Sequence, residues 1–137
     1  GPAPQLDYAA LPMAERAAKT NENILVVCMI ESPTGVANAD AMAAVAGVDV
    51  LLIGTNDLCA EMGIAGQYDH EDVRKAYETV ASACANNGKF LGMGGVYDEE
   101  VASRYIGMGA KMVLAGSDLN FLMQAAKSRT SFMRGLA

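Results

Sequence analysis

The sequence predicts an α/β fold built on a parallel β-sheet. Short apolar runs of strand length alternate with helical stretches, the connections between them are short, and this unit recurs four times within 137 residues. Strands and helices in this order form parallel strands joined by right-handed crossovers. Two architectures fit, a doubly wound open sheet and a (β/α) barrel, and both place ligands at the carboxyl ends of the strands.

The N-terminal part predicts a connecting segment and a helix, followed by the first βα unit. Residues 12–20 are rich in Ala, Met and Lys, which suits a helix. Residues 24–30 are continuously apolar, which is typical of a strand buried on both faces. A helix is predicted from about residue 35 to 46, ended by Gly47. We therefore divide the chain into a connecting segment with a helix (1–23) and the repeated βα part (24–137).

Three further βα units follow in order. Residues 48–54 predict a strand, and residues 69–87 a long helix whose first turn is acidic, as the helix dipole favours. The remaining elements are predicted as strands over 89–95 and 111–116, a helix from Asp98 to about Gly107, and a final helix from Leu119. Because a closed barrel needs eight βα units, these four predict half a barrel with open edges that need covering.

Composition restricts the partners. A formal charge of −6 and a pI near 4.6 argue against binding to nucleic acid, because no basic face is available to displace its counterions. No apolar run reaches the roughly 18 residues of a membrane span, and no secretory leader pattern opens the chain. Three cysteines without CxxC spacing suit a reducing compartment. We expect a cytoplasmic protein that acts on small molecules, with neither nucleic acid nor membrane as a partner.

Several polar or small residues follow the predicted strands, at the edge where ligands gather: Glu31, Asn56, Asp57, Gly94, Gly95, Ser117 and Asp118. Glu31 directly follows seven apolar residues, where burial of an unpaired carboxylate is costly. Two carboxylates that converge from adjacent strands suit a hard cation such as Mg²⁺ or Mn²⁺. Each also has a structural explanation, Glu31 as a helix N-terminal or surface carboxylate and Asp57 as the cap of a short turn over residues 56–62.

Other residues near these strand ends are ambiguous in the same way. The amides after Gly54 are suited to an anion such as a substrate carboxylate, although a tight turn alone also explains this glycine. Gly94 and its glycine neighbours open space for a ligand or only shape a loop. His70, the single histidine, is predicted to cap a helix. Cys59 lies near the site but has no histidine beside it, so a cysteine nucleophile is not expected.

Several segments together resemble one family. They are Met-Ile-Glu-Ser at 29–32, Ala-Asn at 37–38, Ala-Val-Ala-Gly-Val-Asp-Val-Leu-Leu-Ile-Gly-Thr-Asn-Asp-Leu at 44–58, Met-Gly at 62–63, Gly-Lys at 88–89 and Gly-Ser-Asp at 116–118. In this order they resemble the HpcH/HpaI-type class II aldolases from about residue 24 to 124. The resemblance implies a (β/α)₈ TIM barrel, of which this chain supplies the C-terminal four βα units.

The resemblance also implies a reaction and a site. The family cleaves a 4-hydroxy-2-keto acid reversibly to pyruvate, or a related 2-keto acid, and an aldehyde through a metal-stabilised enolate. Glu31 and Asp57 are similar to its ligands for Mg²⁺, Mn²⁺ or Co²⁺, and its substrate-binding positions correspond to Gly54, Thr55, Asn56, Asp57 and Gly94. The family's histidine base, its acidic partner and its arginine match no residue here, so no catalytic residue is expected in this chain.

The sequence departs from the family pattern at three positions and leaves other functions open. Thr55 stands where the family often has proline, Met29 where it often has a polar residue, and Gly94 where it often has a bulkier apolar one. The alternatives are an acyl-CoA lyase similar to citrate lyase β, or a non-catalytic half-barrel that binds metal or pairs with another chain. We expect either a homo-oligomer, in which residues 119–134 have a packing role, or a partner segment that supplies the first half of the barrel.

Overall fold

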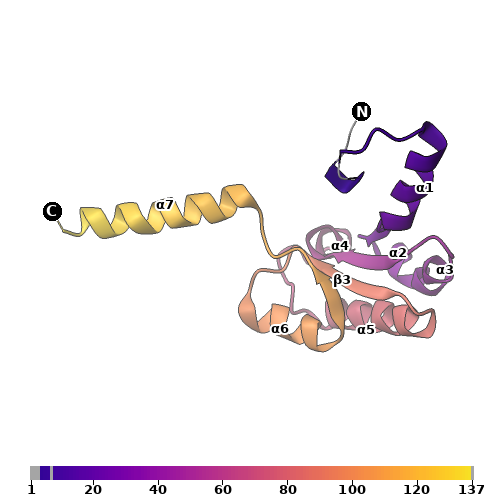
Figure 1. Ribbon diagram of the computed structural model, residues 1–137. Helices are drawn as coiled ribbons and strands as arrows, with labels where there is room; N and C mark the ends of the chain where they lie inside the picture. Colours follow the sequence, from indigo (N-terminus) through magenta and orange to yellow (C-terminus); the bar gives the residue numbers. More distant parts are fainter. Residues whose placement is uncertain (1–3, 7, 137) are drawn as a thin grey trace.

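The computed structural model describes residues 4–6 and 8–136, and its centre is a four-stranded parallel sheet (Figure 1). The strands are β1 (Val27–Ile30), β2 (Val50–Gly54), β3 (Phe90–Gly94) and β4 (Ala110–Val113), in the spatial order β1-β2-β3-β4. Every neighbouring pair is parallel. The predicted α/β fold with four successive βα units is therefore confirmed, and all four carboxyl ends lie at one edge of the sheet.

All four strands are shorter than the ranges that predicted them: β2 begins at Val50 instead of residue 48, and β3 spans Phe90–Gly94 instead of 89–95. Pairing of β1 with β2 begins at Val27, although the prediction began at residue 24. The amide of Val26 instead donates to the side chain of Asp49 at 2.8 Å, and residues 24–26 remain exposed. At the other edge, Leu114 still donates to the carbonyl of Met93 at 2.9 Å, but residues 115 and 116 leave the sheet. The strand predictions for residues 24, 25, 115 and 116 were wrong, because hydrophobicity indicates burial or association in general and not strand pairing.

The helix predicted over residues 35–46 is two short helices, α2 (Pro33–Ala37) and α3 (Ala39–Ala43). They meet at Asn38, whose φ of −98° and ψ of 8° interrupt the helical backbone. The start of α2 is set locally, since Pro33 suits a first helical position and the hydroxyl of Ser32 accepts the amide of Gly35 at 3.1 Å. A further helix, α4 (Thr55–Glu61), directly follows β2, which agrees with the helical turn that the sequence predicts after Gly54.

The longer helices agree with the sequence pattern. They are α5 (Glu71–Asn86), α6 (Glu99–Gly107) and, nearer the ends of the chain, α1 (Met13–Asn23) and α7 (Asp118–Arg134); a short 3₁₀ turn, η1 (Pro4–Leu6), precedes them. His70 caps α5, because its Nδ1 accepts the amide of Asp72 at 3.2 Å. This confirms the predicted capping role of the single histidine.

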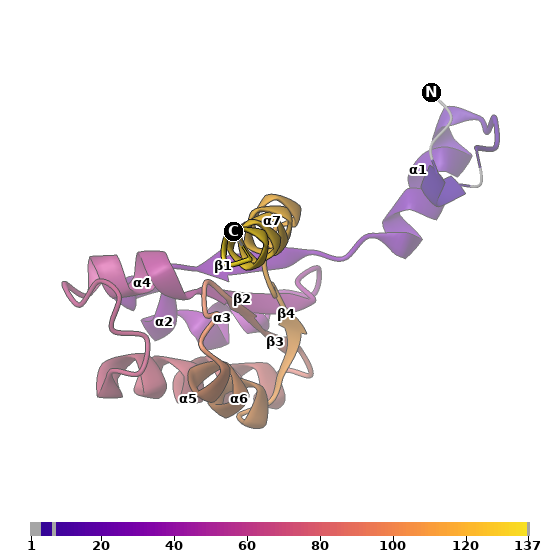
Figure 2. The ribbon, with the colours of Figure 1, turned by 90° about the vertical axis from the view of Figure 1, so that its left-hand side faces the viewer.

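The core lies between the sheet and the helices on one of its faces. Figure 2 shows α5 and α6 on the same side of the sheet, and α3 packs against α5 and β2. Every residue of β2 is buried, as are Val73, Val80 and Tyr77 on α5. Burial of such side chains contributes about 25 cal/mol for each Å² of apolar surface removed from water, so this layer is the main source of stability.

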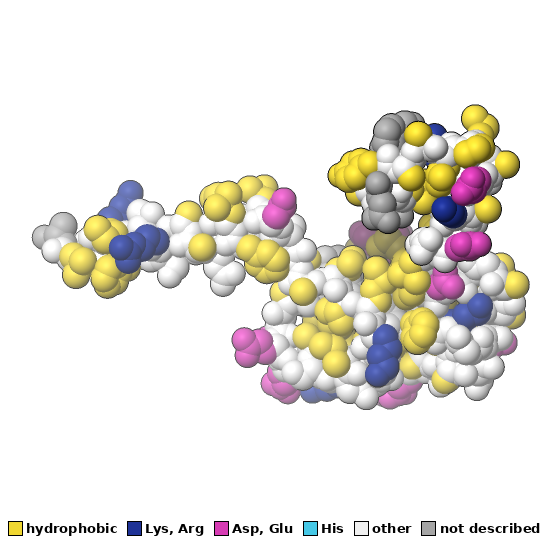
Figure 3. All heavy atoms as spheres, viewed as in Figure 1, with side chains coloured by type: hydrophobic (Ala, Val, Ile, Leu, Met, Phe, Trp, Pro, Cys, Tyr) yellow, Lys and Arg dark blue, Asp and Glu magenta, His cyan; other side chains and the backbone are white. Residues whose placement is uncertain are grey.

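The terminal helices contribute little to this core. Figure 1 shows α7 extending away from the sheet, and neither α1 nor α7 has a buried residue. Apolar side chains are nevertheless visible along α7 (Figure 3), and those most exposed are Leu119, Phe121, Leu122, Met123, Phe132 and Met133. Within the described residues, no helix has the combined length and hydrophobicity that crossing a bilayer requires.

Candidate functional site

A hollow of about 150 Å³ opens at the carboxyl ends of β1, β2 and β3. The residues that line it are Met29, Glu31, Gly54, Thr55, Asn56, Asp57, Gly94, Gly95, Tyr97 and Leu114. All six residues that the sequence predicted as metal or substrate ligands are among them, although they come from three separate βα units. The structure therefore brings the predicted site residues together.

Glu31 and Asp57 are the two acidic side chains of this hollow. Glu31 directly follows β1, and Asp57 lies in the first turn of α4, directly after the neighbouring strand β2. Partial burial raises the pKa of the Glu31 carboxyl, and a hydrogen bond with Asp57 and the negative charge of Asp57 raise this pKa further. Two carboxylates this close repel each other, and a divalent cation between them would relieve that repulsion.

Gly54 is the residue that allows Glu31 to occupy this position. A β-carbon built on Gly54 would lie 2.6 Å from Oε1 and 2.7 Å from Cγ of Glu31, which is closer than any real contact. Any larger residue would therefore displace the Glu31 carboxylate. The glycine is needed for the close approach of the Glu31 side chain, in addition to any effect on the turn.

The end of β3 forms another wall of the hollow. Gly95 has a φ of +80°, and a β-carbon there would lie 2.9 Å from Nδ2 of Asn56. Asn56 is thus held against glycine backbone on one side. A β-carbon on Gly94 would lie 3.2 Å from Cδ1 of Leu114, so this wall is close to apolar side chains and has little spare room.

Thr55 faces inward rather than toward a ligand. Its side chain is fully buried, and its hydroxyl donates to the carbonyl oxygen of Gly94 at 2.7 Å and lies 2.8 Å from the hydroxyl of Tyr77. The hydroxyl is therefore satisfied within the protein, and the main chain of Thr55 is the part left to face a ligand.

Sequence reasoning missed Tyr97 and Leu114, which also line the hollow. Tyr97 follows the end of β3 by three positions, so a search of every residue just beyond each strand would have found it. Conversely, Asp118 does not line the hollow, because it lies in the first turn of α7, where the hydroxyl of Ser117 caps the helix. Cys59 is fully buried, and burial raises the pKa of its thiol, which makes it a poor nucleophile.

The donor set of this hollow suits a cation that keeps other ligands. Among the described residues, no group of three or more His, Cys, Asp or Glu side chains is arranged to hold a metal ion. Glu31 and Asp57 would therefore supply two carboxylates, and the remaining positions would be left to water and substrate. Mg²⁺ binds in this way, through one or two carboxylates with several retained waters.

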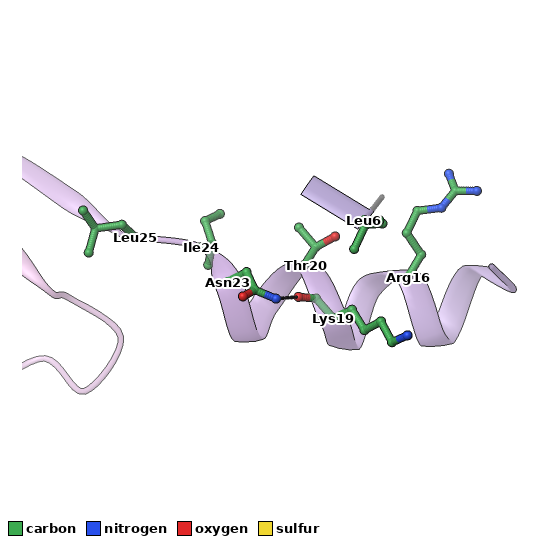
Figure 4. Close-up of a pocket in the computed structure, with 7 residues that line it drawn as sticks. All are labelled: Leu6, Arg16, Lys19, Thr20, Asn23, Ile24 and Leu25. Atoms are coloured by element: carbon green, nitrogen blue, oxygen red, sulfur yellow. Dashed lines mark hydrogen bonds between the residues drawn. The ribbon is translucent and has the colours of Figure 1, made fainter. Parts of the chain in front are cut away.

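A second hollow, of about 350 Å³, lies at the other end of the chain between η1 and α1 (Figure 4). It is lined by Leu6, Arg16, Lys19, Thr20, Asn23, Ile24 and Leu25, and the side-chain amide of Asn23 donates to the carbonyl of Lys19 at 2.8 Å. None of the predicted site residues is part of it. The chemistry predicted from the sequence therefore belongs to the hollow at the strand ends.

Two characterised proteins with similar sequences are named as aldolases. The chain is 41% identical to the 4-hydroxy-4-methyl-2-oxoglutarate aldolase tasA of Hapsidospora irregularis over 103 residues. This aligned region covers 74% of this chain and 38% of that protein. It is also 37% identical to the 5-keto-4-deoxy-D-glucarate aldolase of Shigella dysenteriae serotype 1 over 115 residues, and this aligned region covers 84% of this chain and 44% of that protein. The chain thus spans less than half the length of these two relatives.

Solved structures agree in fold. The HpcH/HpaI aldolase of Desulfitobacterium hafniense DCB-2 superposes with a TM-score of 0.79 at 28% identity, over 93% of this chain and 49% of that one. An HpcH/HpaI aldolase/citrate lyase family protein of Burkholderia cenocepacia J2315 superposes with a TM-score of 0.78 at 30% identity, over 98% of this chain and 52% of that one. These neighbours are TIM-barrel aldolases, and the chain corresponds to about half of their length.

The sequence model of one family covers most of the chain. The model described as HpcH/HpaI aldolase/citrate lyase matches residues 6–125, a range that includes the whole sheet and every residue of the hollow at the strand ends. With the two aldolase relatives and the two solved structures, this match establishes that the chain belongs to the HpcH/HpaI aldolase/citrate lyase family.

Proposed function

We propose that the chain forms the metal-binding half of a class II aldolase site that cleaves a 4-hydroxy-2-keto acid to pyruvate, or a related 2-keto acid, and an aldehyde. The observation that carries this proposal is the convergence of Glu31 and Asp57 from adjacent parallel strands into one hollow. The names of the relatives support the reaction class, since both are aldolases of keto acids.

Glu31 and Asp57 would hold a divalent cation, Mg²⁺, Mn²⁺ or Co²⁺, with one carboxylate each. When bound, such a cation supplies Lewis-acid polarisation of a keto-acid carbonyl. Glu31 is partly buried and in contact with Gly54, so its carboxylate has a restricted position. Asp57 is more exposed and faces the same hollow from α4. The two carboxylates therefore differ in their exposure to water but would bind the same cation.

The substrate carboxylate would lie over the turn that joins β2 to α4. The first amides of a helix have no partner within it, so those of Asn56 and Asp57 are suited to donate to carboxylate oxygens. Gly54 and Gly94, at the ends of paired strands, keep side chains out of this space. Tyr97 and Leu114 line the same hollow and would contact the remainder of the substrate.

Among the described residues that line the hollow there is no histidine, the side chain most often used to transfer a proton at neutral pH. The chain has one histidine, and it caps α5 instead of lining the hollow. We therefore infer that the base comes from another segment or another copy of the chain. The exposed apolar side chains at the edge of β1 and along α7 are consistent with such a partner, either the first half of a barrel or a homo-oligomer.

The same observation favours a second candidate, a non-catalytic half-barrel that binds metal. Metal binding by Glu31 and Asp57 needs no base, so the two candidates differ only in turnover. They share the prediction that both carboxylates are required for metal binding, and this prediction is the part of the proposal that the chain can test alone.

The test combines Mn²⁺ titration with pyruvate release from a 4-hydroxy-2-keto acid, with Mg²⁺, Mn²⁺ or Co²⁺ added and with EDTA as control. The variants are Glu31→Gln and Asp57→Asn, and Asp118→Asn is the matched control because Asp118 also lies in the first turn of a helix that follows a strand. We expect each site variant to weaken Mn²⁺ binding at least about tenfold, and the control to leave it unchanged.

The two readouts separate the candidates. Metal-dependent release of pyruvate that both site variants abolish would support an aldolase. Mn²⁺ binding at these two residues without release would support the non-catalytic half-barrel. If Asp118→Asn weakens Mn²⁺ binding as much as Asp57→Asn does, the assignment of Asp57 as a specific ligand is wrong.

A further inference from the structure

Two hydroxyl groups are buried together directly beneath the hollow at the strand ends. Thr55 is the first residue of α4, and Tyr77 lies in the middle of α5. Both side chains are fully buried, and their hydroxyl oxygens are 2.8 Å apart. The hydroxyl of Thr55 also reaches the carbonyl oxygen of Gly94, the last residue of β3, at 2.7 Å. The three groups therefore connect α5, α4 and β3.

The donors in this chain of hydrogen bonds follow from counting protons. A carbonyl oxygen only accepts, so Thr55 donates its single hydroxyl proton to Gly94. The oxygen of Thr55 is then left to accept, and Tyr77 must be the donor in the other bond. Every hydroxyl is satisfied in this order, and the direction of donation runs from α5 toward the end of β3.

Tyr77 is itself held in place from the far side. Its ring stacks on that of Tyr105 in α6, with centroids 3.7 Å apart and an angle of 4° between the planes. The hydroxyl of Tyr105 donates to the carbonyl of Tyr68, in the loop before α5. The phenol of Tyr77 therefore has a single, supported orientation beneath the hollow.

Thr55 anchors the turn above through the hydrogen bonds of its side chain. Gly54, the residue before α4, has no side chain with which to cap the helix. Thr55 is followed directly by Asn56 and Asp57, and Asn56 contacts the backbone at Gly95 next to the carbonyl that Thr55 binds. The buried side chains of Leu58 and Cys59 also hold α4, and the hydroxyl of Thr55 is the polar group that joins its first residue to β3.

We propose that Tyr77, acting through Thr55, is a positioning residue that directs the carboxylate of Asp57 and the amides beside it toward the bound cation and keto acid. This proposal rests on the proposed function for the identity of the ligand. The arrangement of the turn itself is a property of the metal-free chain and is measurable without ligand.

A buried hydrogen bond also stabilises a fold, so the test must separate positioning from stability. Thr55→Val and Tyr77→Phe each remove one hydroxyl with almost no change in shape, and Thr55→Ser keeps the hydroxyl. The double variant Thr55→Val/Tyr77→Phe removes both hydroxyls, so no tyrosine hydroxyl remains buried without a partner. Thr79→Val is the matched control, because Thr79 is exposed on α5 and its hydroxyl donates to the carbonyl of Lys75 in the same helix.

Three measurements are made on the full 137-residue chain: urea unfolding, Mn²⁺ affinity from the electron paramagnetic resonance of free Mn²⁺, and NMR order parameters of the Asn56 and Asp57 amides without metal. We expect Thr55→Val to lose stability, because the hydroxyl of Tyr77 is left unsatisfied, and the double variant to recover part of that loss. In the double variant, Mn²⁺ affinity should remain about tenfold lower, and the order parameters of the Asn56 and Asp57 amides should be lower than in the unmodified chain. Thr55→Ser and Thr79→Val should keep the affinity and the order parameters near the unmodified values.

The outcomes separate this proposal from the one on which it rests. A double variant with unmodified order parameters and unmodified Mn²⁺ affinity would overturn the positioning role. The positioning role would also be overturned if Mn²⁺ affinity fell only in proportion to stability in Thr55→Val and recovered in the double variant. If the unmodified chain binds no Mn²⁺, the proposed metal site fails, and the order parameters of the metal-free chain still decide whether Tyr77 orders the turn.

Discussion

The helices α4 and α7 each follow a strand, α4 directly and α7 after four residues, and both carry an aspartate in the first turn, yet different forces hold them. The N-terminus of α4 has no side-chain cap, but Thr55, Leu58 and Cys59 are buried. The N-terminus of α7 is capped by the hydroxyl of Ser117, which accepts the amide of Asn120 at 3.3 Å, but no residue of α7 is buried. The first helix depends on tertiary packing, and the second depends on local bonds.

This difference explains why only one of the two aspartates lines the hollow at the strand ends. A carboxylate can be held against a partner from another strand only if its backbone is held as well, because ordering a free turn costs about 1–2 kcal/mol per residue. Asp57 stands on a turn that is bonded to β3 through Thr55. Asp118 stands on a helix without tertiary contacts of this kind, and its carboxylate accepts the amide of its neighbour Leu119 at 2.7 Å.

The largest expected difference between the two helices concerns the truncation of one leucine side chain in each. Leu58 on α4 is fully buried, and Leu122 on α7 is 66% exposed. Leu58→Ala should lower the free energy of unfolding by about 2–5 kcal/mol, because it leaves a cavity in the core. Leu122→Ala should change it by less than about 0.5 kcal/mol. Urea unfolding of the monomeric chain measures both, and equal losses would mean that α7 packs against the body of the molecule.

Alkaline pH should weaken the support beneath α4 and leave α7, which has no tyrosine, unaffected. Burial raises the pKa of Tyr105 to about 12, and burial also raises the pKa of Tyr77. Since an unfolded tyrosine titrates near pH 10, the folded chain holds more protons between about pH 10 and 12, and its stability falls as pH rises through this window.

The size of this effect is about 1.4 kcal/mol for each pKa unit of difference, before allowance for coupling between the rings. Urea unfolding at about pH 9 and pH 11 should therefore show a smaller loss for Tyr77→Phe/Tyr105→Phe than for the unmodified chain. Tyr97→Phe is the control, because Tyr97 is exposed and should leave the pH dependence unchanged. An identical loss in the double variant would show that the buried phenols do not govern alkaline stability.

The smallest expected effect concerns the contact between Gly54 and Glu31. Gly54→Ala places a methyl group where Glu31 now lies, so the carboxylate must shift and Mn²⁺ affinity should fall about tenfold. Gly47→Ala is the matched control, since a β-carbon at Gly47 meets nothing within 4 Å. Unchanged Mn²⁺ affinity in Gly54→Ala would argue against Glu31 as a ligand from its present position.

Much of the site could be predicted because its residues follow strands. Glu31 and Asp57 each come shortly after an apolar run, and parallel strands bring such positions to one edge. Tyr77 could not be predicted in this way. It lies in the middle of a helix, where an aromatic residue reads as ordinary core, and its partner Thr55 is 22 residues away along the chain. The role of a hydroxyl in the core depends on which groups packing brings within reach.

The sequence by itself determined the order of the βα units, the parallel sheet and the family, because hydrophobic runs, helix caps and glycine positions act over a few residues. Only the tertiary structure decided that pairing of β1 with β2 begins at Val27 and that the helix after β1 breaks at Asn38. It also decided that Thr55 faces the core and binds Gly94, 39 residues away. Such choices depend on contacts between distant segments, and local preferences are too weak to settle them.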